Sequence, residues 1–108
     1  MSVKEKDTID AMAENDDELV LLLADNLTWG IAQKEHLSML QKKLNTYIRY
    51  IDSRGWEKEF PGADYSSFKI EIVFRYQYPE YFRDFIDSAE AALKKRNIRI
   101  EYNVYSGE

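Results

Sequence analysis

The order of hydrophobic patterns along this chain most strongly constrains its fold. Two short strand-like segments come first, residues 8–14 and 18–24, with an Asn-Asp-Asp turn signal between them. Residues 31–52 carry apolar side chains at spacings of three and four, which indicates an amphipathic helix. Residues 68–76 alternate as a strand, residues 79–97 form a second helical pattern, and residues 98–105 alternate again. The predicted order is therefore ββαβαβ.

This order predicts a two-layer α/β sandwich with a four-stranded mixed sheet and two helices on one face. The segment over residues 68–105 is a strand–helix–strand crossover, and such a unit makes its two strands parallel. The sequence leaves open where the first two strands lie relative to that parallel pair. For a chain of 108 residues we expect a flexible arm over residues 1–7 and a single domain over residues 8–105.

The first helical pattern is unusually rich in apolar residues. Its main stripe consists of Leu37, Leu40, Leu44, Tyr47, Ile48 and Ile51. Met39 and Tyr50 lie beyond this stripe, and we expect that part of the helix to pack against the second helix. Thr28 or Gly30 is the expected N-cap, and Gly55 is the expected left-handed residue that ends the helix.

The net charge of −5 is concentrated near the start of the chain. Residues 1–28 hold eight acidic residues against two lysines, a balance of −6, whereas the remainder has a balance of +1. This distribution predicts repulsion of nucleic acid and attraction of a basic protein partner. No apolar run approaches the roughly 20 residues that span a bilayer, and the start lacks the apolar segment of a secretory signal. The absence of cysteine excludes disulfides and suits a cytoplasmic protein.

Motifs for catalysis are not apparent in the sequence. His36 is the single histidine and lies at the rim of the apolar stripe, which favours a partly buried structural side chain. The acidic run over residues 14–18 lacks the glycine and distal glutamate of a calcium-binding loop. The four glycines are scattered, so no phosphate-binding loop is present. We therefore predict no catalytic residues, no cofactor and no metal site.

Two surfaces are candidates for binding. The strand over residues 18–24 is apolar on both faces, and its outer face, with Met12, should form an apolar patch beside an acidic turn. The candidate interface consists of Asp16, Asp17, Val20, Leu22, Val73 and Tyr105. The alternative surface lies around the long loop after the first helix, because loops often carry function. Its residues are Trp29, His36, Trp56, Phe60 and Tyr65.

Several segments resemble a family of small bacterial proteins known only as a domain of unknown function. They are Asp25-x-Leu27-x-Trp29, Glu35-His36-Leu37, Leu40-Gln41-x-Lys43-Leu44-Asn45-Thr46-Tyr47 and Ile70-x-Ile72-Val73-Phe74-x-Tyr76. The resemblance implies a small α/β domain of bacterial origin and brings no catalytic or binding residues with it.

The sequence alone does not determine a function, and two classes stay open. The first is a non-catalytic protein–protein interaction module, such as an immunity-type or regulatory partner of another bacterial protein, with a homodimer also open. The second is a small-ligand-binding or enzymatic domain with a pocket near the aromatic loop. A deep polar pocket around Trp29, His36 and Trp56 would favour the second class.

Overall fold

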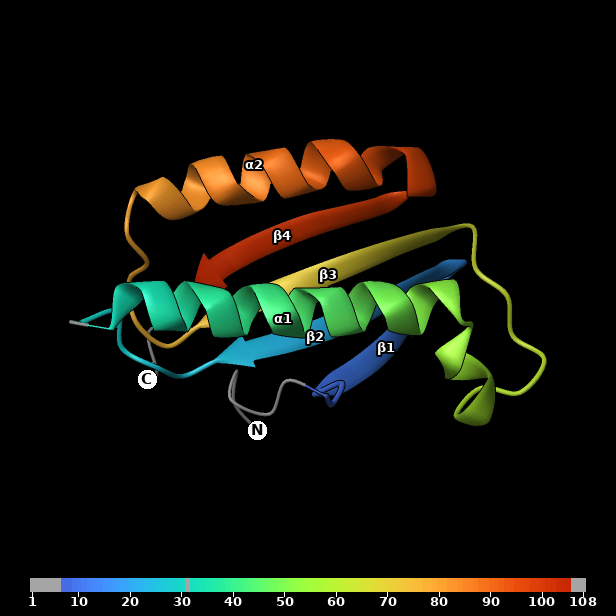
Figure 1. The fold of residues 1–108 in the computed structure, drawn as a ribbon. Helices are drawn as coiled ribbons and strands as arrows, with labels where there is room; N and C mark the ends of the chain where they lie inside the picture. The colour runs from blue at the N-terminus through green and yellow to red at the C-terminus, as the bar shows by residue number, and fades with distance from the viewer. Residues whose placement is uncertain (1–6, 31, 106–108) are drawn as a thin grey trace.

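A computed structural model describes residues 7–30 and 32–105 of the chain (Figure 1). The strands and helices are β1 (Ala11–Asn15), β2 (Glu18–Asp25), α1 (Gln33–Asp52), β3 (Ser67–Phe74), α2 (Tyr81–Leu93) and β4 (Ile98–Val104). Two short 3-10 helices, Gly55–Lys58 and Lys94–Arg96, follow α1 and α2. The predicted order ββαβαβ is confirmed. The arm predicted over residues 1–7 lies outside the described residues except for Asp7.

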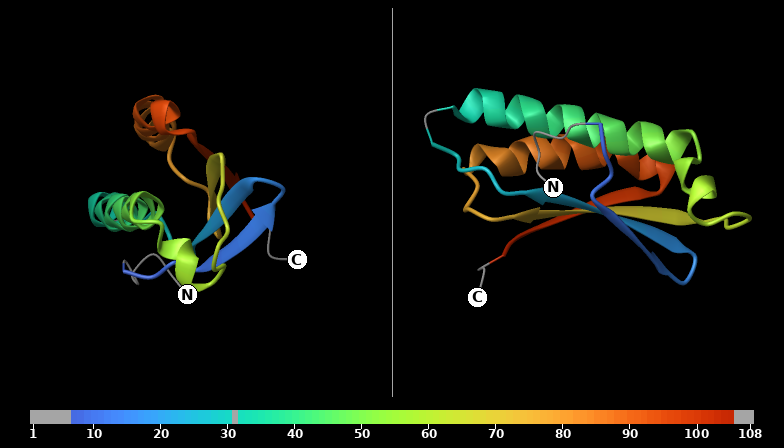
Figure 2. Two further views of the ribbon diagram at one scale, coloured as in Figure 1. Left: turned by 90° about the vertical axis from the view of Figure 1, so that its right-hand side faces the viewer. Right: turned by 90° about the horizontal axis from the view of Figure 1, so that it is seen from below.

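The four strands form one mixed sheet in the order β1-β2-β3-β4. β1 runs antiparallel to β2, whereas β2, β3 and β4 are parallel to one another. Each helix therefore belongs to a crossover between neighbouring parallel strands, and both crossovers step in the same direction across the sheet. Two such crossovers of the same hand place their helices on the same face. Figure 2 shows both helices on one side of the sheet, as predicted.

The core lies between the sheet and the helices. The strand alternation predicted from the sequence supplies it, because every second residue of β2 and β3 points toward the helices. The fully buried strand residues are Leu19, Leu21, Leu23, Ile70, Ile72 and Phe74. Leu40, Leu44 and Tyr47 of α1 and Phe82 and Ile86 of α2 meet them from the other layer. The apolar stripe of the first helix thus faces the sheet.

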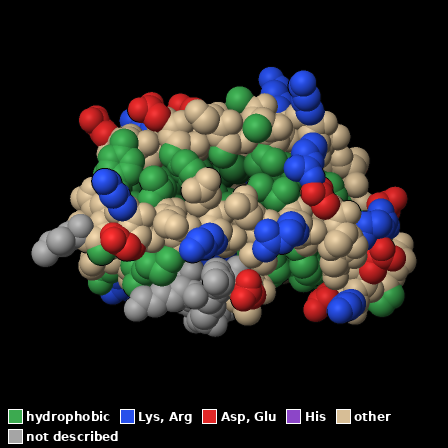
Figure 3. All heavy atoms as spheres, viewed as in Figure 1, with side chains coloured by type: hydrophobic (Ala, Val, Ile, Leu, Met, Phe, Trp, Pro, Cys, Tyr) green, Lys and Arg blue, Asp and Glu red, His purple; other side chains and the backbone are tan. Residues whose placement is uncertain are grey.

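The two helices do not close tightly over the sheet. An apolar groove of about 90 Å³ lies between them, and Leu44, Ile48, Phe85 and Ala89 are among its lining residues. Figure 3 shows this groove as a band of hydrophobic side chains between α1 and α2.

The expectation that the wider arc of α1 packs against α2 was wrong. Met39 lies one turn before Lys43, and Lys43 contacts Asp10 beside β1, on the side of α1 that is turned away from the groove. Tyr50 packs against Gly55 in the connection that follows the helix. Both side chains therefore cover the β1 side of the core.

The ends of α1 also differ from the prediction. Ala32 is the N-cap, and no side chain caps the helix, whereas Gln33 Nε2 donates to the carbonyl of Trp29. At the other end, Arg54 adopts the left-handed conformation with φ of 57°, and Gly55 does not. Gly55 is required for a different reason, since a Cβ there would lie 2.5 Å from the Tyr50 ring.

One residue of the first strand was assigned to the wrong face. Met12 pairs with Leu21, so it points toward the helices rather than outward. Ala11 and Ala13, which pair with Leu22 and Val20, lie on the outer face. The alternation in this strand consists of small and large apolar residues, so hydrophobicity does not distinguish its two faces.

Replacement of Leu44 tests the packing of α1. Leu44 is 4% exposed, so Leu44→Ala should lower the free energy of unfolding by roughly 2–5 kcal/mol through lost burial and a cavity. Urea unfolding measures this change. The exposed neighbour Lys42 is the control, and Lys42→Ala should shift stability by no more than about 0.5 kcal/mol. A Leu44→Ala loss below about 1 kcal/mol would contradict this packing.

Candidate functional site

An ion pair lies completely buried beneath α1. Lys43 Nζ donates to Asp10 Oδ1 at 2.6 Å, and neither side chain has any solvent-exposed surface. The other carboxylate oxygen of Asp10 accepts the Ala24 amide at 2.8 Å. Buried charges need this degree of pairing, because the loss of hydration of each ion costs several kcal/mol. The pair therefore fixes α1 to the residue that precedes β1.

The hydroxyl group of Tyr47 also joins α1 to Asp10 and to β2. It accepts the amide of Asp10 at 2.9 Å and donates to the carbonyl of Leu22 at 2.6 Å. The pairing of β1 with β2 ends at Ala11 and Leu22, so the hydroxyl continues the ladder where the strands part. Burial raises the pKa of the Tyr47 phenol, which keeps it a neutral hydrogen-bond donor.

A second buried pair joins β2 to the start of α1. His36 Nε2 lies 2.5 Å from Asp25 Oδ2, and Nδ1 lies 3.0 Å from the Thr28 carbonyl oxygen. Because a carbonyl can only accept, Nδ1 carries a proton. The Trp29 ring stacks on the imidazole with centroids 3.7 Å apart. His36 is 2% exposed, so it is more deeply buried than the sequence predicted.

The surroundings of Asp25 favour its protonated form. Burial raises the pKa of this carboxyl, although the hydrogen bond and charge of His36, the Leu27 amide and the charge of Lys43 oppose the shift. Its Oδ1 accepts the Leu27 amide at 3.1 Å. Asp25 therefore holds its proton to a higher pH in the folded protein than in the unfolded chain.

The Asp25–His36 pair resembles a catalytic dyad only in composition. In a dyad, the carboxylate orients one ring nitrogen while the other nitrogen takes a proton from the nucleophile. Here Asp25 occupies one nitrogen of His36 and the Thr28 carbonyl occupies the other. Both nitrogens are used within the fold, so this geometry positions α1 on the sheet and offers no base to a substrate.

The alternative surface predicted around the aromatic loop is divided into two clusters. Trp29 and His36 lie at the start of α1, whereas Trp56, Phe60 and Tyr65 follow its end. The 20 residues of α1 span roughly 30 Å, which separates the two clusters.

The aromatic side chains after α1 pack onto the core. The Trp56 side chain is 2% exposed and donates to the Ala63 carbonyl at 3.1 Å. Its ring meets the Tyr65 ring edge-on, with centroids 5.4 Å apart, and Phe60 packs on the same core. The residues of the alternative surface therefore form two separate clusters, one at each end of α1.

The apolar strand residues of the candidate interface alternate with the buried residues of β2 and β3, so they lie on the sheet face opposite the helices (Figure 2). Val20, Leu22 and Val73 point outward and are partly buried by their neighbours, whereas Tyr105 is 55% exposed. Within the described chain, no helix covers this face. The outer face thus carries an apolar strip, and the sequence placed these four residues on the correct side of the sheet.

Asp16 and Asp17 lie at one end of this strip, in the turn between β1 and β2. Asp16 adopts the left-handed conformation, with φ of 56°. Asp17 is tied to the loop before β3, because its Oδ2 accepts the Ser66 hydroxyl at 2.5 Å and its carbonyl accepts the Ser66 amide. The eight residues of β2 put this turn about 26 Å from the other end of the strip.

The opposite end of the strip is hollowed. A shallow cavity of about 170 Å³ is lined there by Ala24, Asp25, Asn26, Val73, Arg75 and Tyr105. The part of the outer face over β3 and β4 is different in character, because Lys69 and Arg99 form ion pairs with Glu101 at 3.2 Å. The outer face is therefore mainly apolar over β1, β2 and the end of β3 at Val73, and charged around Lys69, Arg99 and Glu101.

Sequence reasoning missed most of the buried polar residues. Lys43 lies three residues after Leu40 and four before Tyr47, so its position on the apolar stripe was visible in the sequence. Asp25 ends an apolar strand, which is also a visible signal. The pairing of Asp10 with Lys43 was not visible, because 33 residues separate them. Within the described chain, no group of three or more His, Asp or Glu side chains is arranged to hold a metal ion.

Comparison with known proteins agrees with the resemblance found in the sequence. A family of unknown function, DUF6572, matches residues 1–106. The chain belongs to this family. No curated protein and no solved structure matches the chain. Among the described helices, none is both long and apolar enough to cross a membrane.

Replacement of Lys43 tests the buried ion pair. Lys43→Met keeps much of the side-chain shape but leaves the Asp10 carboxylate buried without its cation. We expect a loss of about 3–5 kcal/mol in the free energy of unfolding. Lys42→Met, on the exposed face one residue earlier, is the matched control and should be nearly neutral. Equal losses for both variants would show that the Lys43 ammonium is not buried.

Replacement of Asp25 tests the raised pKa of its carboxyl. A carboxyl with a raised pKa stabilises the folded state fully below its unfolded pKa of 3.8 and less as the pH rises toward the folded value. Asp25→Asn mimics the protonated acid at every pH. The stability of wild type relative to this variant should therefore fall as the pH rises above 3.8. Urea unfolding at several pH values measures this, and a constant difference would contradict the shift.

Proposed function

We propose that this protein is a non-catalytic interaction module that binds another protein through the outer face of its sheet. The single observation that carries the proposal is the apolar strip over Val20, Leu22 and Val73, which no described helix covers. Sheets in two-layer folds commonly keep one face wet, but such a face is then mainly polar. An apolar strip on the wet face, here bordered on β3 by Lys69 and Glu71, is characteristic of a surface that another molecule covers.

The charge at the turn end of the strip supports a basic partner. Asp16 and Asp17 are both exposed and lie next to the strip. Acidic groups beside an apolar centre attract a basic partner at long range and then allow non-polar area to be buried. This attraction should act mainly on the association rate and should weaken as salt is added.

The cellular setting belongs to the same proposal. The resemblance to small bacterial proteins and the absence of cysteine support a role in the cytoplasm of bacteria. There the module would serve as an immunity-type or regulatory partner of another protein. The second candidate function, a ligand-binding or enzymatic domain, finds less support, because Trp29 and Trp56 lie at opposite ends of α1 and are buried.

Variants of the outer face test this function. Leu22→Asp places a charge in the apolar strip while leaving the helix-covered core intact, so it should abolish binding. Asp16→Lys with Asp17→Lys should slow association at low salt without changing the dissociation rate greatly. Affinity capture from the native host would first identify the partner. Surface plasmon resonance with the purified pair would then measure both rates.

The matched control changes a charge on the opposite side of the molecule. Lys42→Glu lies on the exposed face of α1 and should leave both rates unchanged. Circular dichroism must first show that Leu22→Asp is folded. If the folded Leu22→Asp variant binds like wild type, and the two reversals leave association unchanged, the outer face is not the binding surface.

A further inference from the structure

Strand β4 forms one edge of the sheet, and among the described residues no strand pairs with the backbone groups on the side of β4 away from β3. The Phe68 amide donates to the Asn97 carbonyl at 2.9 Å, and the Tyr105 amide donates to the Phe74 carbonyl at 2.7 Å. The odd-numbered residues of β4 therefore bond to β3. In a parallel pair the alternate residues then point their amides and carbonyls away from the neighbour. On β4 these outward-pointing groups belong to Ile98, Ile100, Tyr102 and Val104.

We propose that β4 of one copy pairs antiparallel with β4 of a second copy, so that the two sheets join into one. The binding partner of this edge is a second copy of the chain, because the charges on the edge are complementary when two copies of β4 run antiparallel. Arg99 and Glu101 have side chains on the outer face, one on each side of Ile100 in the sequence. A two-fold axis at Ile100 sets Arg99 of each copy directly opposite Glu101 of the other.

The alternation of the strand selects this register. In the pairing centred on Ile100, the outward-pointing residues become hydrogen-bonded pairs, with Ile98 opposite Tyr102 of the second copy. Arg99 and Glu101 then occupy the intervening positions, where facing side chains approach most closely. Moving the strand to the next allowed register would set Glu101 opposite Glu101, and like charges directly opposite are destabilising.

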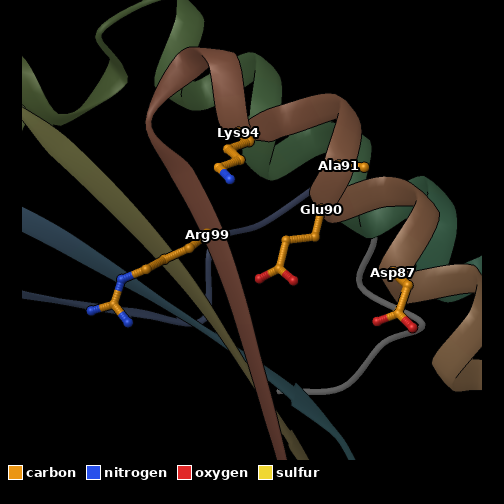
Figure 4. Close-up of a pocket in the computed structure, with 5 residues that line it drawn as sticks. All are labelled: Asp87, Glu90, Ala91, Lys94 and Arg99. Carbon is orange, nitrogen blue, oxygen red and sulfur yellow. The ribbon is translucent and has the colours of Figure 1, made fainter.

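The space beside β4 can admit a strand. Figure 4 shows an open groove between α2 and β4, with Glu90 reaching from the helix toward the strand and Arg99 leaving the strand on the other side. The volume of the groove is about 490 Å³, and Asp87, Glu90, Ala91, Lys94 and Arg99 line it.

One weak hydrogen bond must break when β4 of the second copy pairs with this edge. The Ile100 amide donates to Glu90 Oε2 at 3.3 Å, which is long for such a bond. A carbonyl from the second copy would replace this carboxylate oxygen, and Glu90 would turn into solvent. The exchange restores a shorter backbone bond, so it does not oppose pairing strongly.

The assembly would place two outer faces side by side. The two-fold axis of an antiparallel edge pairing is perpendicular to the sheet, so both outer faces lie on the same side of the joined sheet. The apolar strips around Val20 and Leu22 would then be presented twice. This inference does not rest on the proposed function, because β4 can pair whether or not the outer face binds a partner.

Charge reversal with mixing tests the pairing. In a dimer of the Arg99→Glu variant, glutamate would face glutamate in both of the facing pairs. In a dimer of the Glu101→Arg variant, arginine would face arginine in both pairs. Each variant alone should therefore be monomeric. When the two variants are mixed in equal amounts, every facing pair again joins one glutamate to one arginine, and a heterodimer should form. Sedimentation velocity would detect the association, and native mass spectrometry would identify the mixed species at twice the chain mass of 12.8 kDa.

Controls separate pairing from folding. Arg99 also forms an ion pair with Glu18 within its own chain, so Glu18→Gln removes the negative charge from that contact and should leave wild-type dimerisation intact. Circular dichroism checks that every variant is folded. A monomeric wild type would overturn the proposal. So would dimers of either single variant alone, or a mixture that stays monomeric.

Discussion

The attachment of α1 to the point where β1 and β2 part holds the rest of this structure together. Lys43 and Tyr47, one turn apart on the helix, reach Asp10 and the Leu22 carbonyl respectively. The contact is polar and completely buried, so it is strongly directional, whereas apolar packing alone tolerates sliding. It fixes the rotation of α1 about its axis. That rotation decides which residues face the sheet and which line the groove toward α2.

The Asp25–His36 pair likewise fixes the position of α1 on the sheet, at the start of the helix. The helix lacks a side-chain N-cap, and the contacts of Gln33 with Trp29 and of His36 with Thr28 and Asp25 hold its first turn instead. A buried polar network of this kind is costly unless every member is satisfied. Partners for both ring nitrogens explain how His36 can be almost fully buried.

The sequence allowed prediction of what depends on local periodicity. The order of elements, the inward faces of β2 and β3 and the stripe of α1 followed from spacing alone, because burial repeats with the geometry of each element. Met12 was assigned to the wrong face because apolar residues occupy both faces of this short strand, so hydrophobicity does not tell the faces apart. Asp10 and Lys43 were not joined, because a contact across 33 residues leaves no periodic trace. Gly55 was assigned a left-handed conformation, although it is needed for the close approach of Tyr50.

The division of the outer face has a physical basis in the topology. On the outer face of β1 and β2, the apolar side chains of Ala13, Val20 and Leu22 lie close together, and the ion pair of this region joins Glu18, at the start of β2, to Arg99 of β4. β3 and β4 carry Lys69, Glu101 and Arg99 in neighbouring positions, and the ion pairs among these side chains make that part of the outer face charged and hydrated. A partner that buries non-polar area therefore gains most over β1 and β2. The charged part offers little to such a partner, but its alternating signs suit pairing at the β4 edge. The proposed partner contact and the proposed pairing of β4 therefore use different parts of the sheet.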